Sequence, residues 1–213
     1  MTTQFDQPLV RHPAPQQGEP VWEVANLFPR QGYWTETEYL RLTESYNWPM
    51  ELNDGNLEIL PMPTMKHQDL VAYVYQLLLT FVRANSLGKV FFAPLPIKFG
   101  PKHYREPDVL FLSQTTLKSV KGSYPHTADL VVEVVSEGKE DRERDLVTKR
   151  EVYAEAGIAE YWLVDPKRKR ITVLTLDRDK YIVHGEFAPG TQATSALLSG
   201  FTVDVQAVFA AAQ

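Results

Sequence analysis

The chain has 213 residues, 44% hydrophobic and 23% charged, a composition that supports one globular domain and excludes disorder of the whole chain. It contains no cysteine, which excludes disulfides and thiolate metal sites, so any metal must be bound by oxygen or histidine ligands. The net charge of −5 argues against a surface coated in positive potential, but carboxylates gathered for cations contribute negative charge of their own, so nucleic-acid binding is not excluded.

The first 33 residues contain five prolines among glutamine, glycine and other polar residues, without sustained hydrophobic periodicity. This composition is typical of an extended or partly disordered arm, so we place the folded domain in residues 34–213. The chain does not open on a basic segment followed by an apolar run, and no stretch of about 18 residues is apolar and free of charges. We therefore expect a cytoplasmic protein that makes no contact with membranes.

Two local signals mark the beginning of the predicted domain. Thr35 and Glu38 have the spacing of a capping box, which predicts a short helix ending near Asn47. Asp54 and Gly55 then lie between two short alternating stretches, a pattern that strongly predicts a β-hairpin. The domain therefore opens with a helix followed by a hairpin.

The longest predicted helix begins after Thr64, which can cap it, and Gly88 closes it. Its apolar residues recur at spacings of three and four: Leu70, Val71, Val74, Leu77, Leu78 and Phe81. Extended stretches rich in β-branched and aromatic residues follow at 89–93, 97–99, 109–112 and 130–135. The middle of the chain thus builds a sheet.

A charged amphipathic helix over residues 141–156, stopped by Gly157, interrupts the strands, which resume at 161–164, 171–176 and 181–183. Segments 130–135 and 161–164 are almost continuously apolar, which indicates strands covered on both faces. Such strands require helices on both sides of the sheet. We therefore predict an α/β fold with a central mixed β-sheet flanked by helices.

Two carboxylates occupy positions that a hydrophobic core would not favour. Asp108 follows Pro107 at the entrance of a strand, where its side chain can point into a cleft. Glu133 interrupts the apolar strand LVVEVVS, where an unpaired carboxylate would cost several kcal/mol or shift its pKa upward. A cation bound jointly by Asp108 and Glu133 would compensate it, and oxygen ligands of this kind suit Mg²⁺ or Mn²⁺.

Structural roles are open for each carboxylate taken alone. Asp108 can be a turn residue at a strand entrance, and Glu133 can be the buried ion-pair partner of an arginine. The two residues in this order are more informative than either one.

Three segments, EPDVLFL, LVVEVVSEG and DRERDLVTKREVYAEAGIAEYWLVDP, resemble the signature of a large bacterial group of restriction-endonuclease-like proteins in the PD-(D/E)XK nuclease superfamily. The resemblance runs from about residue 34 to residue 205. It implies a restriction-endonuclease-like core and Mg²⁺-dependent hydrolysis of phosphodiesters. It also implies that Asp108 and Glu133 bind the metal and that Lys149 is the catalytic lysine.

The match departs from the superfamily pattern at the lysine, which ordinarily lies two residues after the glutamate on the same strand face. Val135 stands there, and the resemblance implies that the lysine has moved to the following helix, as Lys149. Lys149 and Tyr153 share one face of that helix with Asp145. The alternative for Lys149 is a solvent-exposed ion pair with Asp145.

Two further residues are auxiliary candidates. Glu51, beside the hairpin, matches a glutamate frequent in the family that could supply another metal ligand, although Asn56 stands where relatives usually have glutamate. His67, near the start of the long helix, can be a site residue or a structural polar residue. With Tyr153 they complete the predicted site.

The implied activity is hydrolysis of nucleic acid, DNA more than RNA, by Mg²⁺-activated water in an endonuclease. A homodimer suits an enzyme that cuts two strands. Two alternatives stay open: a catalytically silent binding or scaffold module on the same fold, and a metal-dependent hydrolase of another phosphoester. No nucleotide-binding P-loop motif is present in the sequence.

Overall fold

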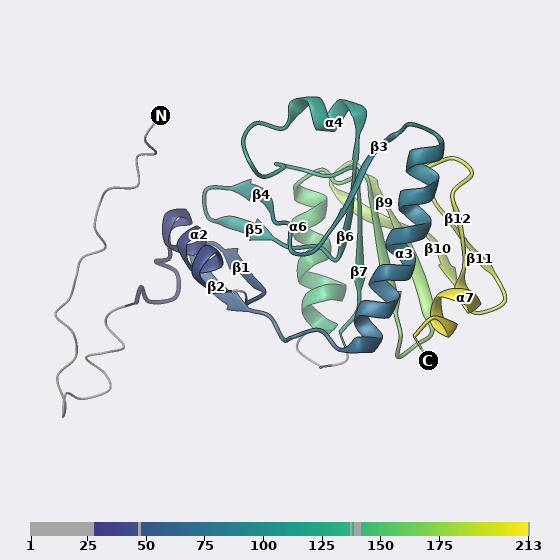
Figure 1. Ribbon diagram of the computed structural model, residues 1–213, viewed down its shortest axis with the longest axis horizontal. Helices are drawn as coiled ribbons and strands as arrows, with labels where there is room; N and C mark the ends of the chain where they lie inside the picture. The colour runs from purple at the N-terminus through teal and green to yellow at the C-terminus, as the bar shows by residue number, and fades with distance from the viewer. Residues whose placement is uncertain (1–27, 47, 137, 139–141, 213) are drawn as a thin grey trace.

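The structure is a computed structural model that describes residues 28–46, 48–136, 138 and 142–212 (Figure 1). The first part contains α2 (Glu36–Ser45), β1 (Met50–Asn53), β2 (Asn56–Ile59), α3 (Met65–Ala84), β3 (Gly88–Phe92), β4 (Ile97–Gly100), β5 (His103–Arg105), β6 (Val109–Ser113) and α4 (Gln114–Ser119). The second part contains β7 (Leu130–Val134), the π-helix η1 (Arg144–Thr148), α6 (Lys149–Glu155), β8 (Glu160–Asp165), β9 (Arg170–Asp177), β10 (Lys180–Phe187), β11 (Gln192–Thr194), β12 (Thr202–Asp204) and α7 (Val205–Ala210).

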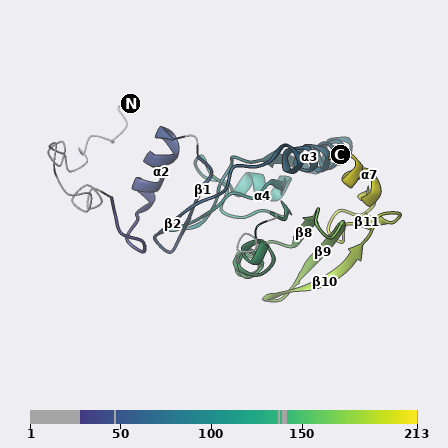
Figure 2. The same ribbon diagram turned by 90° about the horizontal axis from the view of Figure 1, so that it is seen from below.

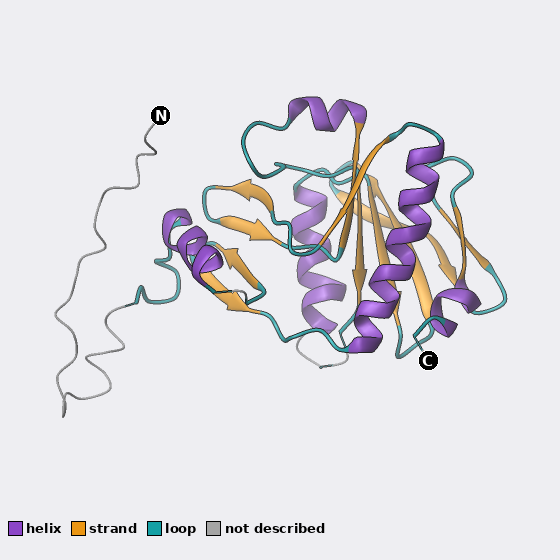
Figure 3. Cartoon of the chain, in the orientation of Figure 1, coloured by secondary structure: helices purple, strands orange, loops and turns teal. Residues whose placement is uncertain are grey.

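The central sheet has six strands in the order β10-β9-β8-β7-β6-β3. Only the β7–β8 pair is parallel among its neighbouring strands, so the sheet is mixed, as predicted. The 20-residue helix α3 and the helical segment formed by η1 and α6 run beside the central strands (Figure 3). Figure 2 shows α2 and the β1–β2 hairpin at one end of the molecule and β11 and α7 at the other. The predicted α/β class with helices flanking a mixed sheet is confirmed.

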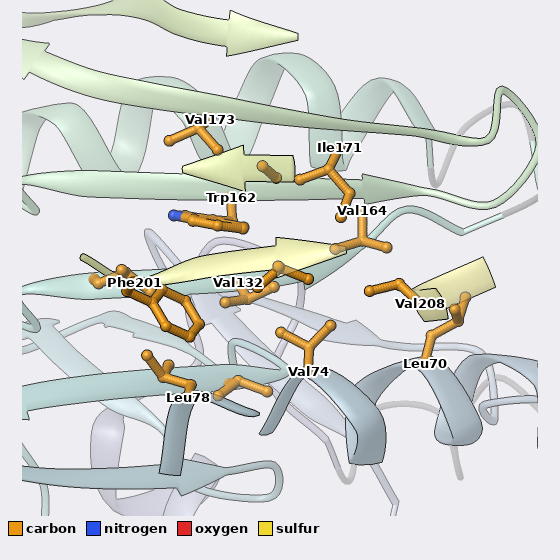
Figure 4. Close-up of a cluster of buried hydrophobic side chains, with 14 of the residues drawn as sticks. Leu70, Val74, Leu78, Val132, Trp162, Val164, Ile171, Val173, Phe201 and Val208 are labelled. Atoms are coloured by element: carbon orange, nitrogen blue, oxygen red, sulfur yellow. The ribbon is translucent and has the colours of Figure 1, made fainter. Parts of the chain in front are cut away.

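The two faces of the sheet pack against different helices because successive strand residues point to opposite sides. Val132 and Trp162 belong to the core cluster that includes α3 and α7, part of which Figure 4 shows. Val131 and Tyr161 belong to the cluster that includes Tyr153 of α6. Strands β7 and β8 are buried along their whole length, as their continuous apolar sequence predicts.

The ends of the predicted elements follow local chemistry closely. Thr35 caps α2 in a capping box with Glu38, although the helix ends at Ser45, slightly before the predicted end. The β1–β2 turn uses Asp54 and Gly55, both with positive φ, as a two-residue hairpin turn requires. These predictions rest on short-range geometry and are confirmed.

The prediction that Gly88 closes the long helix is wrong. Helix α3 ends at Ala84, and Ser86 adopts the left-handed conformation with φ 53°. Gly88 instead opens β3, where a Cβ would lie 2.0 Å from the carbonyl oxygen of Leu112 on β6. Glycine therefore serves close strand pairing at this position rather than the helix terminus.

A second sheet, in the order β2-β1-β5-β4, packs under α2 and carries one side of the site. Of the predicted arm, residues 1–27 lie outside the described residues, and the division at residue 33 remains a prediction. Gln31 exchanges two hydrogen bonds with the backbone of Leu57, and the Gly32 N–H donates to the Gly55 carbonyl. Among the described residues, no helix combines the length and apolarity needed to cross a membrane.

Candidate active site

Antiparallel pairing of β6 with β7 brings the two predicted metal-binding carboxylates together. Val109 pairs with Val132, so the same register places Asp108 beside Glu133. The Val134 N–H donates to Asp108 Oδ2 at 2.7 Å and fixes that carboxylate at the strand entrance. Both residues line a cavity of about 300 Å³.

Glu133 is buried, as its apolar surroundings in the sequence predict, with 3% of its surface exposed. Its Oε1 accepts a hydrogen bond from the Tyr153 hydroxyl at 2.6 Å and lies 2.9 Å from Lys149 Nζ. Burial, with smaller contributions from repulsion by Asp108 and Asp145, raises the pKa of the Glu133 carboxyl to about 8, against the opposing effects of Lys149 and the Tyr153 hydroxyl. Burial therefore favours the neutral form of Glu133 unless a nearby cation stabilises its charge.

Lys149 lies among three carboxylates. Its Nζ is 2.9 Å from Glu133, 3.5 Å from Asp145 Oδ1 and 3.9 Å from Glu51 Oε1, and its side chain is 4% exposed. Although burial opposes the charge, these carboxylates raise the pKa of Lys149. Lys149 does pair with Asp145, but both side chains are buried, so the alternative of a solvent-exposed ion pair is wrong.

A π-helical turn sets the position of Lys149 on its helix. The Lys149 N–H donates to the Arg144 carbonyl, five residues back, and α6 begins at Lys149. Within this turn, Asp145 is held by the Ser136 N–H, which donates to its Oδ2 at 3.1 Å. Single π-helical turns inside α-helices occur frequently at functional sites. Here the turn delivers Asp145 and Lys149 together to the cavity side of the sheet.

Glu51 links the second sheet to the site. It is fully buried; Arg105 Nη1 donates to its Oε2 at 2.7 Å, and the Glu106 N–H donates to its Oε1 at 3.0 Å. Although burial works in the opposite direction, the charges of Lys149 and Arg105 lower the pKa of Glu51. Glu51 is thus an ionised, hydrogen-bonded neighbour of Lys149.

His67 approaches the cavity from the first turn of α3. Its Nε2 lies 3.4 Å from Asp108 Oδ2, and Nδ1 is buried without a partner within the described part of the chain. Burial lowers the pKa of His67, but Asp108 outweighs this effect and raises it. Of the six predicted site residues, four line the cavity, His67, Asp108, Glu133 and Lys149. Glu51 and Tyr153 lie behind it, against Lys149 and Glu133 respectively, and the chemical roles of all six remain a prediction.

Sequence reasoning assigned no role to Glu106 or Arg105. Glu106 lines the cavity; burial and then the charge of Glu51 raise its pKa to about 7, with Lys149 opposing. The sequence feature that could have indicated Glu106 as a site residue is its position two residues before Asp108. Arg105 is a buried arginine of the kind considered as a partner for Glu133, yet it pairs with Glu51 and Glu58.

Comparison with known proteins accords with this geometry. Residues 36–206 match the sequence profile of the Uma2 family, described as "Putative restriction endonuclease". The chain belongs to the Uma2 family. The matched range contains every residue that lines the cavity, and the predicted restriction-endonuclease-like relationship is confirmed.

A solved structure shares the fold of this Uma2 protein. It is described as "a putative nuclease belonging to DUF820" from Anabaena variabilis, with a TM-score of 0.66 and 20% sequence identity over 87% of this chain and 100% of that one. At this identity the similarity establishes the fold alone. No curated protein matches the chain.

Proposed function

We propose that this Uma2 protein is a nuclease that hydrolyses phosphodiester bonds of nucleic acid, DNA more than RNA, with Mg²⁺ or Mn²⁺ bound by Asp108 and Glu133. The observation that carries the proposal is the convergence of these two carboxylates and buried Lys149 on one cavity. The description of the family, as restriction endonucleases, supports the same reaction.

The donor atoms fit a hard divalent cation. Within the described residues no three histidine or acidic side chains form a ready metal cluster. Asp108 and Glu133 nevertheless supply two carboxylates on one face, and the burial that raises the pKa of Glu133 leaves its ionised form in need of a nearby cation. When bound, the cation would lower the pKa of a water molecule and neutralise charge on the phosphate.

The protein's own side chains orient the reacting groups and supply positive charge. Tyr153 and Lys149 hold Oε1 of Glu133, and the Val134 N–H holds Asp108, so both carboxylates are fixed before substrate binds. The Lys149 ammonium, kept charged by its carboxylate neighbours, provides a cation for the negative charge that develops on the phosphate. No covalent intermediate with the protein is required.

The proposal is tested by incubating purified protein with supercoiled, linear and single-stranded DNA and with RNA, in the presence of Mg²⁺, Mn²⁺ or Ca²⁺. We expect cleavage with Mg²⁺ or Mn²⁺ that Asp108→Ala abolishes. A protein that cleaves none of these substrates with any cation is not the proposed enzyme.

A measurement of cation binding distinguishes the proposed enzyme from the alternative, a catalytically silent binding or scaffold module. The enzyme hypothesis predicts a melting temperature that rises with Mg²⁺ or Mn²⁺ in the wild-type protein and does not rise in Asp108→Ala. A module that has lost its metal site shows the same melting temperature with and without the cation in both proteins.

A further inference from the structure

A second cavity, of about 230 Å³, adjoins the catalytic one. It is lined by Lys66, Leu70, Pro166, Lys169, Phe209 and Ala212. Lys66 and Pro166 also line the catalytic cavity, so the two cavities are neighbours at the start of α3 and the β8–β9 turn. The second cavity thus combines four apolar residues with two lysines, Lys66 and Lys169.

The β8–β9 turn is held firmly beside this cavity. Asp165 ends β8, accepts the Arg168 N–H at 3.0 Å within the turn, and forms a two-bond ion pair with Arg142 at 2.6 and 3.1 Å. Arg142 belongs to the helical segment that leads to Lys149. The turn therefore keeps a fixed place relative to the catalytic cavity.

The four basic residues of this turn differ in their partners. Arg170 pairs with Glu186 at 2.7 Å, and Arg168 Nε lies 3.9 Å from Asp165 Oδ2. Lys167 and Lys169 are exposed, and no carboxylate within the described residues forms an ion pair with either. Lys169 lines the second cavity, and Lys167 follows Pro166, which lines both cavities. In a chain of net charge −5, these two lysines without carboxylate partners make this turn locally positive.

We propose that Lys167 and Lys169 bind backbone phosphates of the substrate strand next to the bond that is cut, with Lys66 between them and the catalytic cavity. This inference rests on the proposed function, because it takes nucleic acid as the ligand. The first turn of α3, which contains no acidic residue, adds the positive end of a 20-residue helix beside the same cavity. Phosphate contacts of this kind fix the register of the substrate without reading its sequence.

The β9–β10 turn provides a matched control. Arg178 and Lys180 are exposed basic residues at the opposite end of β9 from Lys167 and Lys169. Each pair contains one left-handed residue, Lys169 with φ 47° and Arg178 with φ 58°. Lys167→Gln/Lys169→Gln and Arg178→Gln/Lys180→Gln therefore remove the same charge from the two ends of β9.

The test measures binding of fluorescein-labelled duplex and single-stranded DNA by anisotropy in EDTA, over a range of salt concentrations. We expect Lys167→Gln/Lys169→Gln to weaken binding about tenfold or more. The slope of log K against log salt concentration should fall by about 1.8 for duplex DNA or about 1.4 for single strands, the value for two lost phosphate contacts. The control pair should leave the affinity and the slope close to those of the wild-type protein.

Cleavage measured beside binding separates this inference from the proposed function. Weakened binding with a reduced slope upholds the phosphate contacts even if no variant cleaves DNA, in which case the proposed function alone fails. Normal cleavage with unchanged affinity and slope overturns the phosphate contacts and leaves the nuclease intact. Equal losses in both turn variants, or no binding by the wild-type protein, also overturn the inference.

Discussion

Replacing Lys149 by methionine removes a positive charge from among three carboxylates while keeping a side chain of similar length. Nζ lies 2.9 Å from Glu133 and 3.5 Å from Asp145, and the side chain is 4% exposed. Removing one partner of a buried ion pair costs about 3–5 kcal/mol, because the remaining charge stays buried. An exposed ion pair with Asp145 would instead make the substitution nearly neutral for stability.

The size of the loss should depend on pH through Glu133. The folded pKa of Glu133, about 8, lies above its ordinary value of 4.5, so a proton neutralises this carboxylate near neutral pH and leaves as pH rises through the folded pKa. Without Lys149 that pKa rises further. The destabilisation by Lys149→Met should therefore be smaller at about pH 6 than at about pH 9, where the full 3–5 kcal/mol is expected.

Urea unfolding without divalent cations, at both pH values, measures these free energies. The double variant Lys149→Met/Glu133→Gln should recover stability at the higher pH, because the glutamine side chain is neutral yet its amide oxygen still accepts the Tyr153 hydroxyl. A destabilisation below about 0.5 kcal/mol at both pH values, typical of surface substitutions, would refute the buried-pair reasoning. So would a double variant whose loss equals the sum of the single losses.

The same lysine should matter for catalysis. Lys149→Ala should slow cleavage at saturating Mg²⁺ by about 10²- to 10³-fold, the loss expected on removing one group that stabilises charge in the transition state. Lys149→Arg should restore little of the rate, because a planar guanidinium does not replace a compact ammonium. Single-turnover rates near the wild-type rate would remove Lys149 from the reaction.

Three further predictions concern stability and assembly. Between about pH 4.5 and about pH 8 the metal-free wild-type protein should lose stability as pH rises, because folded Glu133 holds its proton, and Glu133→Gln should make this slope shallower in urea titrations, with Glu106 and His67 still contributing to it. Asp165 behaves in the opposite way: although burial opposes it, Arg142 and the Arg168 N–H lower its pKa, so its contribution should vanish as pH falls below 3.8, and Asp165→Asn should destabilise the protein at neutral pH but not in acid. Light scattering should give twice the chain mass of 24.3 kDa if the predicted homodimer forms, whereas the single-chain mass would contradict it.

Features set by neighbouring residues were predictable from the sequence. The capping box at Thr35 and the hairpin at Asp54 depend on a few consecutive residues, and both formed as predicted. The burial of Glu133 followed from the apolar residues around it, and its placement beside Asp108 follows from antiparallel pairing of two neighbouring strands. The proximity of Asp108 and Glu133 could therefore be predicted from the sequence.

Features set by distant contacts were not predictable. Glu51 and Arg105 are 54 residues apart, and no local pattern pairs them or reveals strand β5 between its partners β1 and β4. Gly88 has the signature of a helix terminus, but the approach of Leu112 from another strand decides its role. The burial of Lys149 depends on the π-helical turn before it, which a regular helical period does not predict.

Metal-dependent cleavage by wild-type protein and Asp108→Asn, followed on one labelled DNA under single-turnover conditions, tests the central claim most directly. The asparagine keeps an oxygen for the Val134 N–H but removes the negative charge, so the fold should be retained. The proposed mechanism predicts Mg²⁺-dependent cleavage by the wild-type protein and a loss of at least about 10²-fold in Asp108→Asn. Equal rates in the two proteins, or cleavage that persists in EDTA, would contradict a metal site built on Asp108 and Glu133.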